Sequence, residues 1–125
     1  MGVRDDDPDL NELCECDHKL LITHGTGDYL VPWQRIRYFY TAAMHLGNSE
    51  SDFMNHVRCF LIPHAGHSFY DWDAPNVVLK DAVTALMDWV EKGIAPESLP
   101  TKEYTFNGDI TTREDEAIVY RANKK

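Results

Sequence analysis

Two short motifs place an aspartate and a histidine where they could move protons. The His-Gly-Thr-Gly-Asp segment at residues 24–28 closes one apolar run, and the Pro-His-Ala-Gly-His segment at residues 63–67 closes the next. A histidine can take a proton from a nucleophile and return it to a leaving group when its ring is held in one tautomer. A buried carboxylate fixes that tautomer and stabilises the imidazolium that forms. We therefore predict that Asp28 is the orienting carboxylate and His67 the base of a catalytic site.

The order of these two residues along the chain points to one class of hydrolase. An acid and then a histidine, each just after a predicted strand, is the second half of a Ser, Asp, His set in the chain order of the α/β-hydrolases. The alternative is structural: Asp28 caps the following helix or shapes a turn, and His67 is an ordinary loop histidine.

The nucleophile of such a set is not found in the sequence. Ser49 and Ser51 lie in a polar segment between predicted elements, and Ser98 follows the last predicted helix. Ser68 begins a match to G-x-S-x-G, but Tyr70 occupies the position where that turn needs glycine. No cysteine lies in a nucleophile context either, so the catalytic set is incomplete.

Two strands are predicted to carry the acid and the histidine. Residues 20–22 form a short continuous apolar run, typical of a parallel strand covered on both faces, and the largely apolar residues 57–62 are predicted to be the second strand. A helix is predicted between them from Pro32 to a stop at Gly47, with residues 48–55 as a loop. One intervening helix implies a parallel crossover, so both loops should meet at the carboxyl edge of the sheet. Glycines in these loops are predicted to let the backbone turn sharply, at positions 25, 27 and 66.

A second helix follows the histidine loop. Pro75 is predicted in its first turn and Gly93 as its stop. Its apolar residues repeat at helical spacing and are predicted to form one stripe: Leu79, Ala82, Val83, Leu86 and Val90.

These elements divide the chain into three parts and predict an α/β fold. Residues 1–18 are an acidic lead-in, residues 19–97 carry the strand-helix units, and residues 98–125 form an irregular polar tail. Within that tail, residues 107–108 are a turn signal and residues 118–120 a possible short strand. Two strands alone would leave open sheet edges, so we predict a partial α/β-hydrolase fold: C-terminal strand-helix units of a parallel sheet in a three-layer α/β/α arrangement.

Charge and composition exclude several function classes. The net charge of -9 over 125 residues argues against nucleic acid and against an anionic membrane surface as partner. No apolar stretch approaches the length that spans a bilayer, and the acidic first residues do not resemble a signal peptide. The compartment is left open.

The sequence predicts neither a cofactor nor a metal site. Three cysteines form no standard zinc pattern and are predicted to be one buried thiol and two incidental ones: Cys14, Cys16 and Cys59. His64, His67 and Asp71 could be drawn as metal ligands, but this spacing on a loop provides no common face. His24 is predicted to pack beneath the loop at the end of its strand.

Several motifs together resemble the tannase and feruloyl esterase family. They are Asp-Leu at 9–10, Lys-Leu-Leu-Ile-Thr-His-Gly-x-x-Asp at 19–28, Val-Pro-Trp at 31–33 and Arg-x-Phe-Leu-Ile-Pro-x-x-Gly-His at 58–67. The most specific is Asp-Trp-Val-Glu-Lys-Gly-Ile-Ala-Pro-Glu-Ser-Leu at 88–99. The resemblance covers roughly residues 9–100 and concerns the C-terminal part of the family's enzymes.

The resemblance implies a serine esterase. Such enzymes hydrolyse phenolic-acid esters, such as those of gallate or ferulate, with Ser, Asp and His on an α/β-hydrolase core that carries a large lid. By motif, Asp28 takes the acid position and His67 the base position, while the nucleophile, oxyanion hole and lid would precede Met1. Family members are commonly secreted.

Two departures from the family pattern concern residues near the site and in the tail. Many members have a cysteine directly after the histidine, bridged to one beside the nucleophile, and here that position is Ser68. The family's usual Arg-Pro-Leu-Cys-Pro-Tyr-Pro-like ending is missing, since Arg113 is followed by Glu and Asp. The bridged form of the site is therefore not expected.

Three hypotheses follow. In the first, the chain is the C-terminal fragment of a tannase-like serine esterase, inactive alone because it supplies only acid and base. In the second, it is a non-catalytic interaction module derived from an α/β-hydrolase. In either case the partner is the missing N-terminal part, or a second copy that completes the sheet. The third is a small metal-binding protein using Cys14, Cys16 and the loop of His64 and His67.

Overall fold

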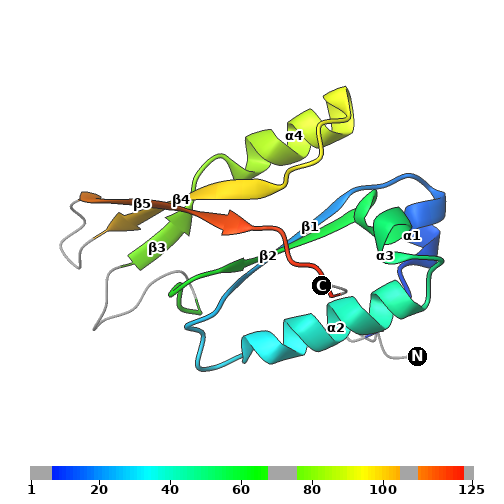
Figure 1. Cartoon of the computed structure of the whole chain (residues 1–125), viewed down its shortest axis with the longest axis horizontal. Helices are drawn as coiled ribbons and strands as arrows, with labels where there is room; N and C mark the ends of the chain where they lie inside the picture. Colours follow the sequence, from blue (N-terminus) through cyan, green and yellow to red (C-terminus); the bar gives the residue numbers. More distant parts are fainter. Residues whose placement is uncertain (1–6, 68–75, 105–109, 123–125) are drawn as a thin grey trace, which may run out of the picture.

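The fold is mixed α and β, with one parallel pair of strands and one antiparallel sheet (Figure 1). The computed structural model describes residues 7–67, 76–104 and 110–122. The elements in chain order are α1 (Asn11–Glu15), β1 (Leu20–Gly25), α2 (Trp33–His45), α3 (Glu50–Met54), β2 (Val57–Ile62), β3 (Asn76–Leu79), α4 (Ala82–Lys92), β4 (Ser98–Tyr104) and β5 (Ile110–Ile118). Within the described ranges no helix has both the length and the apolar character needed to cross a bilayer.

The predicted parallel pair is confirmed. β1 and β2 run parallel, with Leu20 opposite Val57 and Gly25 opposite Ile62. Successive side chains along each strand point to opposite faces, and each face packs into a different hydrophobic core. Ile22 faces the core beneath α2, whereas Leu21 faces the core shared with the antiparallel sheet. Both faces of the pair are therefore covered, with α2 and α4 on opposite sides (Figure 1).

The first predicted helix is confirmed and an unpredicted one follows it. Pro32 precedes α2 with an extended backbone, and Tyr40 on its inner face is fully buried. The interpretation of residues 48–55 as a loop was wrong, because α3 forms there. Its N-terminus is capped by Ser49, whose hydroxyl oxygen accepts a hydrogen bond from the Asp52 amide at 3.1 Å. The helix has only five residues, which would not be stably helical in isolation, so we attribute its stability to the burial of Phe53.

The acidic lead-in is also more ordered than its composition suggested. The helix α1 lies within it, and Leu10 and Leu13 pack against the core under α2. Together with Cys14, these residues give the segment a tertiary partner, although it shows no long hydrophobic period. The division at residue 18 itself stays a prediction.

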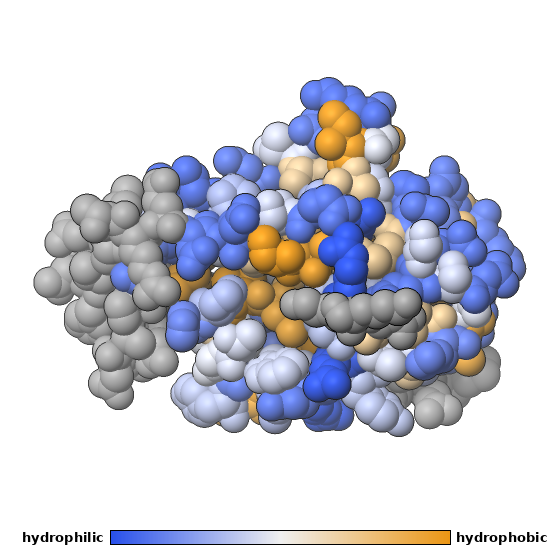
Figure 2. All heavy atoms as spheres, viewed as in Figure 1, coloured by the Kyte–Doolittle hydropathy of each residue, from blue (hydrophilic) through white to orange (hydrophobic). Residues whose placement is uncertain are grey.

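The second predicted helix begins later than expected and buries a different face. Leu79 belongs to the strand β3, and Pro75 lies outside the described residues. Ala82 packs on the core and Trp89 is buried, but Val83 and Val90 are 72% and 63% exposed. The prediction of one helical stripe was therefore wrong for Leu79, which is not in the helix, and the other members do not share one buried face. Apolar side chains are visible on the surface of α4, at the top of Figure 2. The predicted stop at Gly93 is confirmed, with φ of 71° after the last turn.

The prediction of an irregular tail from residue 98 was wrong. β3, β4 and β5 form an antiparallel sheet in that order, with Leu99 opposite Ala117 in the core. The predicted turn at residues 107–108 lies outside the described residues. The predicted strand at 118–120 is confirmed in part: Val119 bridges Phe60 in β2, and the Tyr120 amide donates to the Cys59 carbonyl at 2.8 Å.

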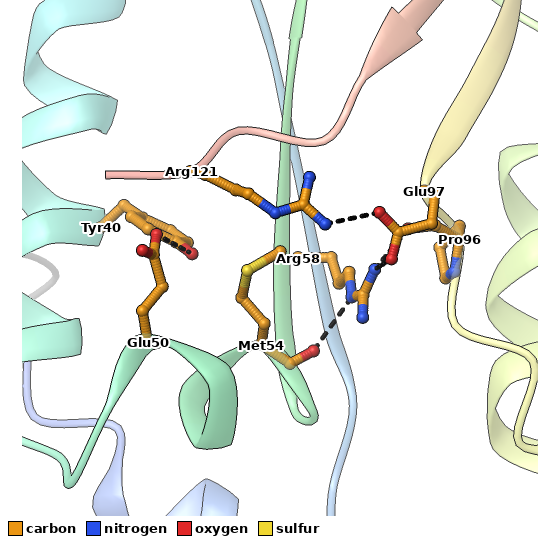
Figure 3. A network of polar contacts seen from close by, with 7 residues as sticks. All are labelled: Tyr40, Glu50, Met54, Arg58, Pro96, Glu97 and Arg121. Carbon is orange, nitrogen blue, oxygen red and sulfur yellow. Dashed lines mark hydrogen bonds and ion pairs between the residues drawn. The ribbon is translucent and has the colours of Figure 1, made fainter. Parts of the chain in front are cut away.

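A charged network joins this C-terminal segment to the parallel pair (Figure 3). Arg58 of β2 is buried and donates to the carbonyls of Met54 and Pro96, at 3.0 and 3.1 Å, and to Glu97. Arg121 reaches the other carboxylate oxygen of Glu97 at 2.6 Å. These hydrogen bonds, from Arg121 first and Arg58 second, hold the pKa of Glu97 below its usual value. The network ties three segments together at the start of β2.

Candidate functional site

The two predicted site loops start side by side. Because β1 and β2 are parallel and Gly25 pairs with Ile62, the segments that follow leave the sheet at the same edge. Backbone bonds then join the segments directly. The Thr26 amide donates to the Ile62 carbonyl at 3.0 Å, and the Gly27 amide to the Ala65 carbonyl at 2.9 Å.

A close backbone approach explains the first glycine of the acid loop. A Cβ on Gly25 would lie 2.1 Å from the Ala65 carbonyl oxygen, so no larger residue fits without moving the backbone. Gly27 is less crowded, with the same oxygen 3.1 Å away. The chain does turn after Gly25, whose carbonyl accepts a hydrogen bond from the Asp28 amide at 3.3 Å, but neither glycine has a positive φ, so the requirement at these two positions is for space. The left-handed backbone lies instead at His64, with φ of 64°, where the Thr26 hydroxyl accepts the amide at 3.1 Å.

The structure brings Asp28 and His67 together. His67 Nδ1 lies 2.9 Å from Asp28 Oδ2. The carboxylate is buried, with 3% of its side chain exposed, whereas the His67 side chain is 49% exposed. An ionised carboxylate only accepts hydrogen bonds, so Nδ1 carries the hydrogen and Nε2 is the nitrogen left to take up a proton. The catalytic roles of both residues stay a prediction.

The other oxygen of Asp28 organises its own loop. Asp28 Oδ1 accepts the amides of Leu30 and Val31, each at 2.9 Å. Burial alone would raise the pKa of the Asp28 carboxyl, but hydrogen bonds from Val31, His67 and Leu30 outweigh it, so this pKa lies below its usual value. Asp28 is therefore ionised at neutral pH. The turn-forming alternative and the histidine-orienting role coexist, one on each oxygen.

A second histidine, which was not predicted to be part of the site, lies beside the same carboxylate. His24 Nε2 is 2.8 Å from the Val31 carbonyl oxygen and 3.5 Å from Asp28 Oδ2. Its side chain is 14% exposed, consistent with the prediction that it packs beneath the loop. An aspartate side chain often accepts hydrogen bonds from backbone amides two and three residues further along the chain, which forms a turn. This local pattern could have indicated the hydrogen bonds within the Asp28 loop.

The remaining candidates are not brought to the pair. His64 is exposed, and Ser68 and Asp71 lie outside the described residues. In the described part of the chain, no three His, Cys, Asp or Glu side chains are grouped so that they could hold a metal ion. No serine, threonine or cysteine within those same residues is hydrogen-bonded to His67.

None of the three cysteines lies in the loops that carry Asp28 and His67. Cys59 is buried in β2, where burial raises its pKa to about 12, and Cys16 is exposed. Cys14 is half-buried in α1, and burial raises its pKa as well. The prediction of a buried strand thiol is confirmed.

This geometry can orient and polarise a histidine. A buried, ionised carboxylate on Nδ1 favours the tautomer whose Nε2 accepts a proton, and it stabilises the imidazolium afterwards. The two loops are joined by backbone hydrogen bonds from the amides of Thr26 and Gly27, which help to hold the pair in place.

Relatives with sequence similarity cover nearly the whole chain. Residues 3–123 match the model of a family described as tannase and feruloyl esterase. A probable feruloyl esterase of Arthroderma benhamiae is 36% identical over 107 residues, which cover 83% of this chain and 19% of that protein. Feruloyl esterase B of Aspergillus niger is 29% identical over 119 residues, which cover 83% of this chain and 22% of the relative. The chain thus spans about a fifth of the length of these relatives.

Solved structures show the same fold. Feruloyl esterase B from Aspergillus oryzae matches with a TM-score of 0.78 at 20% identity, covering 91% of this chain and 25% of that one. Tannin acyl hydrolase from Aspergillus niger matches with a TM-score of 0.73 at 19% identity, covering 90% and 22%. The match over residues 3–123 decides the assignment: the chain belongs to the tannase and feruloyl esterase family.

Proposed function

We propose that this chain supplies the acid and base of a serine ester hydrolase, with Asp28 orienting His67. The observation that carries the proposal is the 2.9 Å contact between His67 Nδ1 and the buried Asp28 Oδ2. The nucleophile comes from a protein segment outside this sequence. The fold that fits this role is the C-terminal part of an α/β-hydrolase, a parallel sheet between two helical layers, of which β1 and β2 are two strands.

In the proposed reaction His67 acts at Nε2. It takes the proton of the serine hydroxyl as the oxygen attacks the ester carbonyl, and it gives that proton to the alcohol that leaves. Water then repeats the sequence on the acyl-enzyme and releases the acid. Asp28 stabilises the imidazolium in both steps and stays ionised, which its lowered pKa favours. We propose phenolic-acid esters as substrates because the relatives include feruloyl esterases.

A chimera tests the proposal. This chain replaces the matching segment of Aspergillus niger feruloyl esterase B, and hydrolysis of methyl ferulate and methyl gallate is measured. We expect turnover by the chimera, and kcat lower by roughly a thousandfold or more in its His67→Ala variant. His64→Ala is the matched control in the same loop and keeps the activity. A folded, active chimera that His67→Ala leaves unchanged would reject the proposal, as would turnover by the isolated chain that His67→Ala abolishes.

The open edge of β1 supports a proposal about how the hydrolase sheet is completed. Within the described residues β1 pairs only with β2, and its residues 20–24 are partly exposed, whereas most of β2 is buried. The other edge of β2 is covered by Val119 and Tyr120. A strand added to β1 in parallel would end at the same edge as Asp28 and His67. We propose that the nucleophile-bearing part of the hydrolase adds there.

A second candidate function is a non-catalytic interaction module that self-associates. The exposed apolar row that runs along α4 and just past its end favours an interface there, with members spaced at three and four residues: Val83, Met87, Val90 and Ile94. Light scattering at micromolar concentration distinguishes the two. A dimer that Val83→Lys and Val90→Lys dissociate supports the module, with Tyr38→Lys on α2 as control. A strictly monomeric chain counts against it.

A further inference from the structure

Two histidines share the carboxylate of Asp28, and only one of them is used in the proposed reaction. His67 contacts Oδ2 from the solvent side, with half of its side chain exposed. His24 approaches from β1, and strand alternation places it on the same face as Ile22, under the start of α2. Its contacts, at 2.8 Å to the Val31 carbonyl and 3.5 Å to Asp28 Oδ2, are both made by Nε2.

The partner of His24 determines its tautomer. A backbone carbonyl oxygen can only accept, so the Nε2 of His24 carries a hydrogen and donates it to Val31. At 3.5 Å the carboxylate is too distant for a good hydrogen bond, but it faces the positive end of the same N–H group.

This bond fixes the residue on which the acid depends. The carbonyl of Val31 accepts from His24, while its amide donates to Asp28 Oδ1. Val31 is therefore held on both sides between the end of β1 and the start of α2. With Oδ1 tied to the amides of Leu30 and Val31, the carboxylate plane is set and Oδ2 is directed to His67. Little of His24 is exposed, so water cannot easily take its place at the carbonyl.

We propose that His24 is a positioning residue, which holds the acid loop so that Asp28 Oδ2 points at His67 Nδ1. Its catalytic meaning rests on the proposed function, but its effect on the orientation of His67 does not. Without the donor at position 24, the Val31 backbone loses its bond on the carbonyl side, so the neighbouring peptide group, whose amide anchors Oδ1, is held less firmly. The carboxylate then loses its fixed plane.

The test measures the tautomer of His67 in the full 125-residue chain by two-bond proton–nitrogen NMR of 15N-labelled protein. We expect wild-type His24 in the Nε2–H form and His67 mainly in the Nδ1–H form. In His24→Leu, which keeps bulk but removes the donor, the Nδ1–H fraction of His67 falls by about half or more. His24→Gln restores it, because the side-chain amide can donate to the Val31 carbonyl. Asp28→Asn gives the value expected for complete loss, and His45→Leu, at the exposed end of α2, is the matched control.

The outcomes separate positioning from a merely structural role. An unchanged His67 tautomer in a folded His24→Leu variant overturns the proposal, and so does a failure of His24→Gln to restore it. If both variants lose the amide pattern of β1 and β2 while His45→Leu keeps it, His24 serves the fold and the proposal is rejected. No hydrolysis is measured, so an inactive chimera would count against the proposed function and leave this result unaffected.

Discussion

Replacing Gly25 by alanine tests whether the two site loops are held together by direct backbone contact. The added Cβ would lie 2.1 Å from the oxygen and 2.6 Å from the carbon of the Ala65 carbonyl. Both are backbone atoms next to the end of β2, so no flexible side chain can move aside. Overpacking costs typically 1–3 kcal/mol, and because backbone must shift here we expect about 3 kcal/mol or more. That is roughly a hundredfold in the folding equilibrium.

Two other glycines supply a graded control. Gly27→Ala would place a Cβ 3.1 Å from the same oxygen, which a shift of a few tenths of an ångström relieves, at about 1 kcal/mol. Gly47→Ala meets only ordinary contacts, the nearest at 3.5 Å, and its φ is not positive. We expect that variant to lie within about 0.5 kcal/mol of the wild type.

Urea unfolding followed by tryptophan fluorescence measures this order. With a slope of about 2 kcal/mol/M, the midpoint of Gly25→Ala falls by about 1.5 M relative to the wild type. If the variant stays folded, the contact between Asp28 and His67 should be weakened, because the loops have moved apart. Equal midpoints for the Gly25 and Gly47 variants would refute the claim that backbone contact at Ala65 joins the loops.

Three further predictions concern the acid, the charged network and the thiols. The pKa of Asp28 is lowered by folding, so it contributes stability above its unfolded pKa of about 3.9, and this is lost as pH falls toward the folded pKa. The urea midpoint should therefore fall more steeply between about pH 5 and 3 in the wild type than in Asp28→Asn, and parallel curves would contradict this. Arg58→Met should lower the free energy of unfolding by about 2–4 kcal/mol, because it leaves the carbonyls of Met54 and Pro96 without their hydrogen-bond donor. Arg121 is more exposed, so Arg121→Met should lower it by about 1 kcal/mol or less. Similar losses for both variants in urea unfolding would be evidence against this difference. Iodoacetamide at pH 8 should alkylate Cys16 in the folded chain and leave Cys59 unmodified until urea is added, and mass spectrometry showing early modification of Cys59 would disprove its burial.

Local patterns were enough to predict the elements that carry the site. The apolar runs at β1 and β2 and the helical period of α2 are short-range signals, because each is decided by the side chains that one element buries. Aspartate and histidine just past the two strands could be recognised as a pair for the same reason. Parallel strands bring their following loops to one edge whatever the loops contain.

Contacts between distant segments decided the rest. β4 and β5 contain many charged residues and a proline, and they are strands because they pair with each other and bury Leu99 and Ala117. That pairing is a property of two segments and leaves no period in either one. The exposure of Val83 has the same origin, since the helical stripe shows only that α4 has an apolar face.

The site shows the same division. The types and order of Asp28 and His67 could be read from the sequence, together with the absence of a recognisable nucleophile. Only the tertiary structure shows that Gly25 is required for space, that Asp28 divides its two oxygens between its own loop and His67, and that His24 contacts the Val31 carbonyl of that loop. The physical reason is that hydrogen bonds and steric exclusion act over a few ångströms, so they depend on which backbone atoms become neighbours after the two strands have paired.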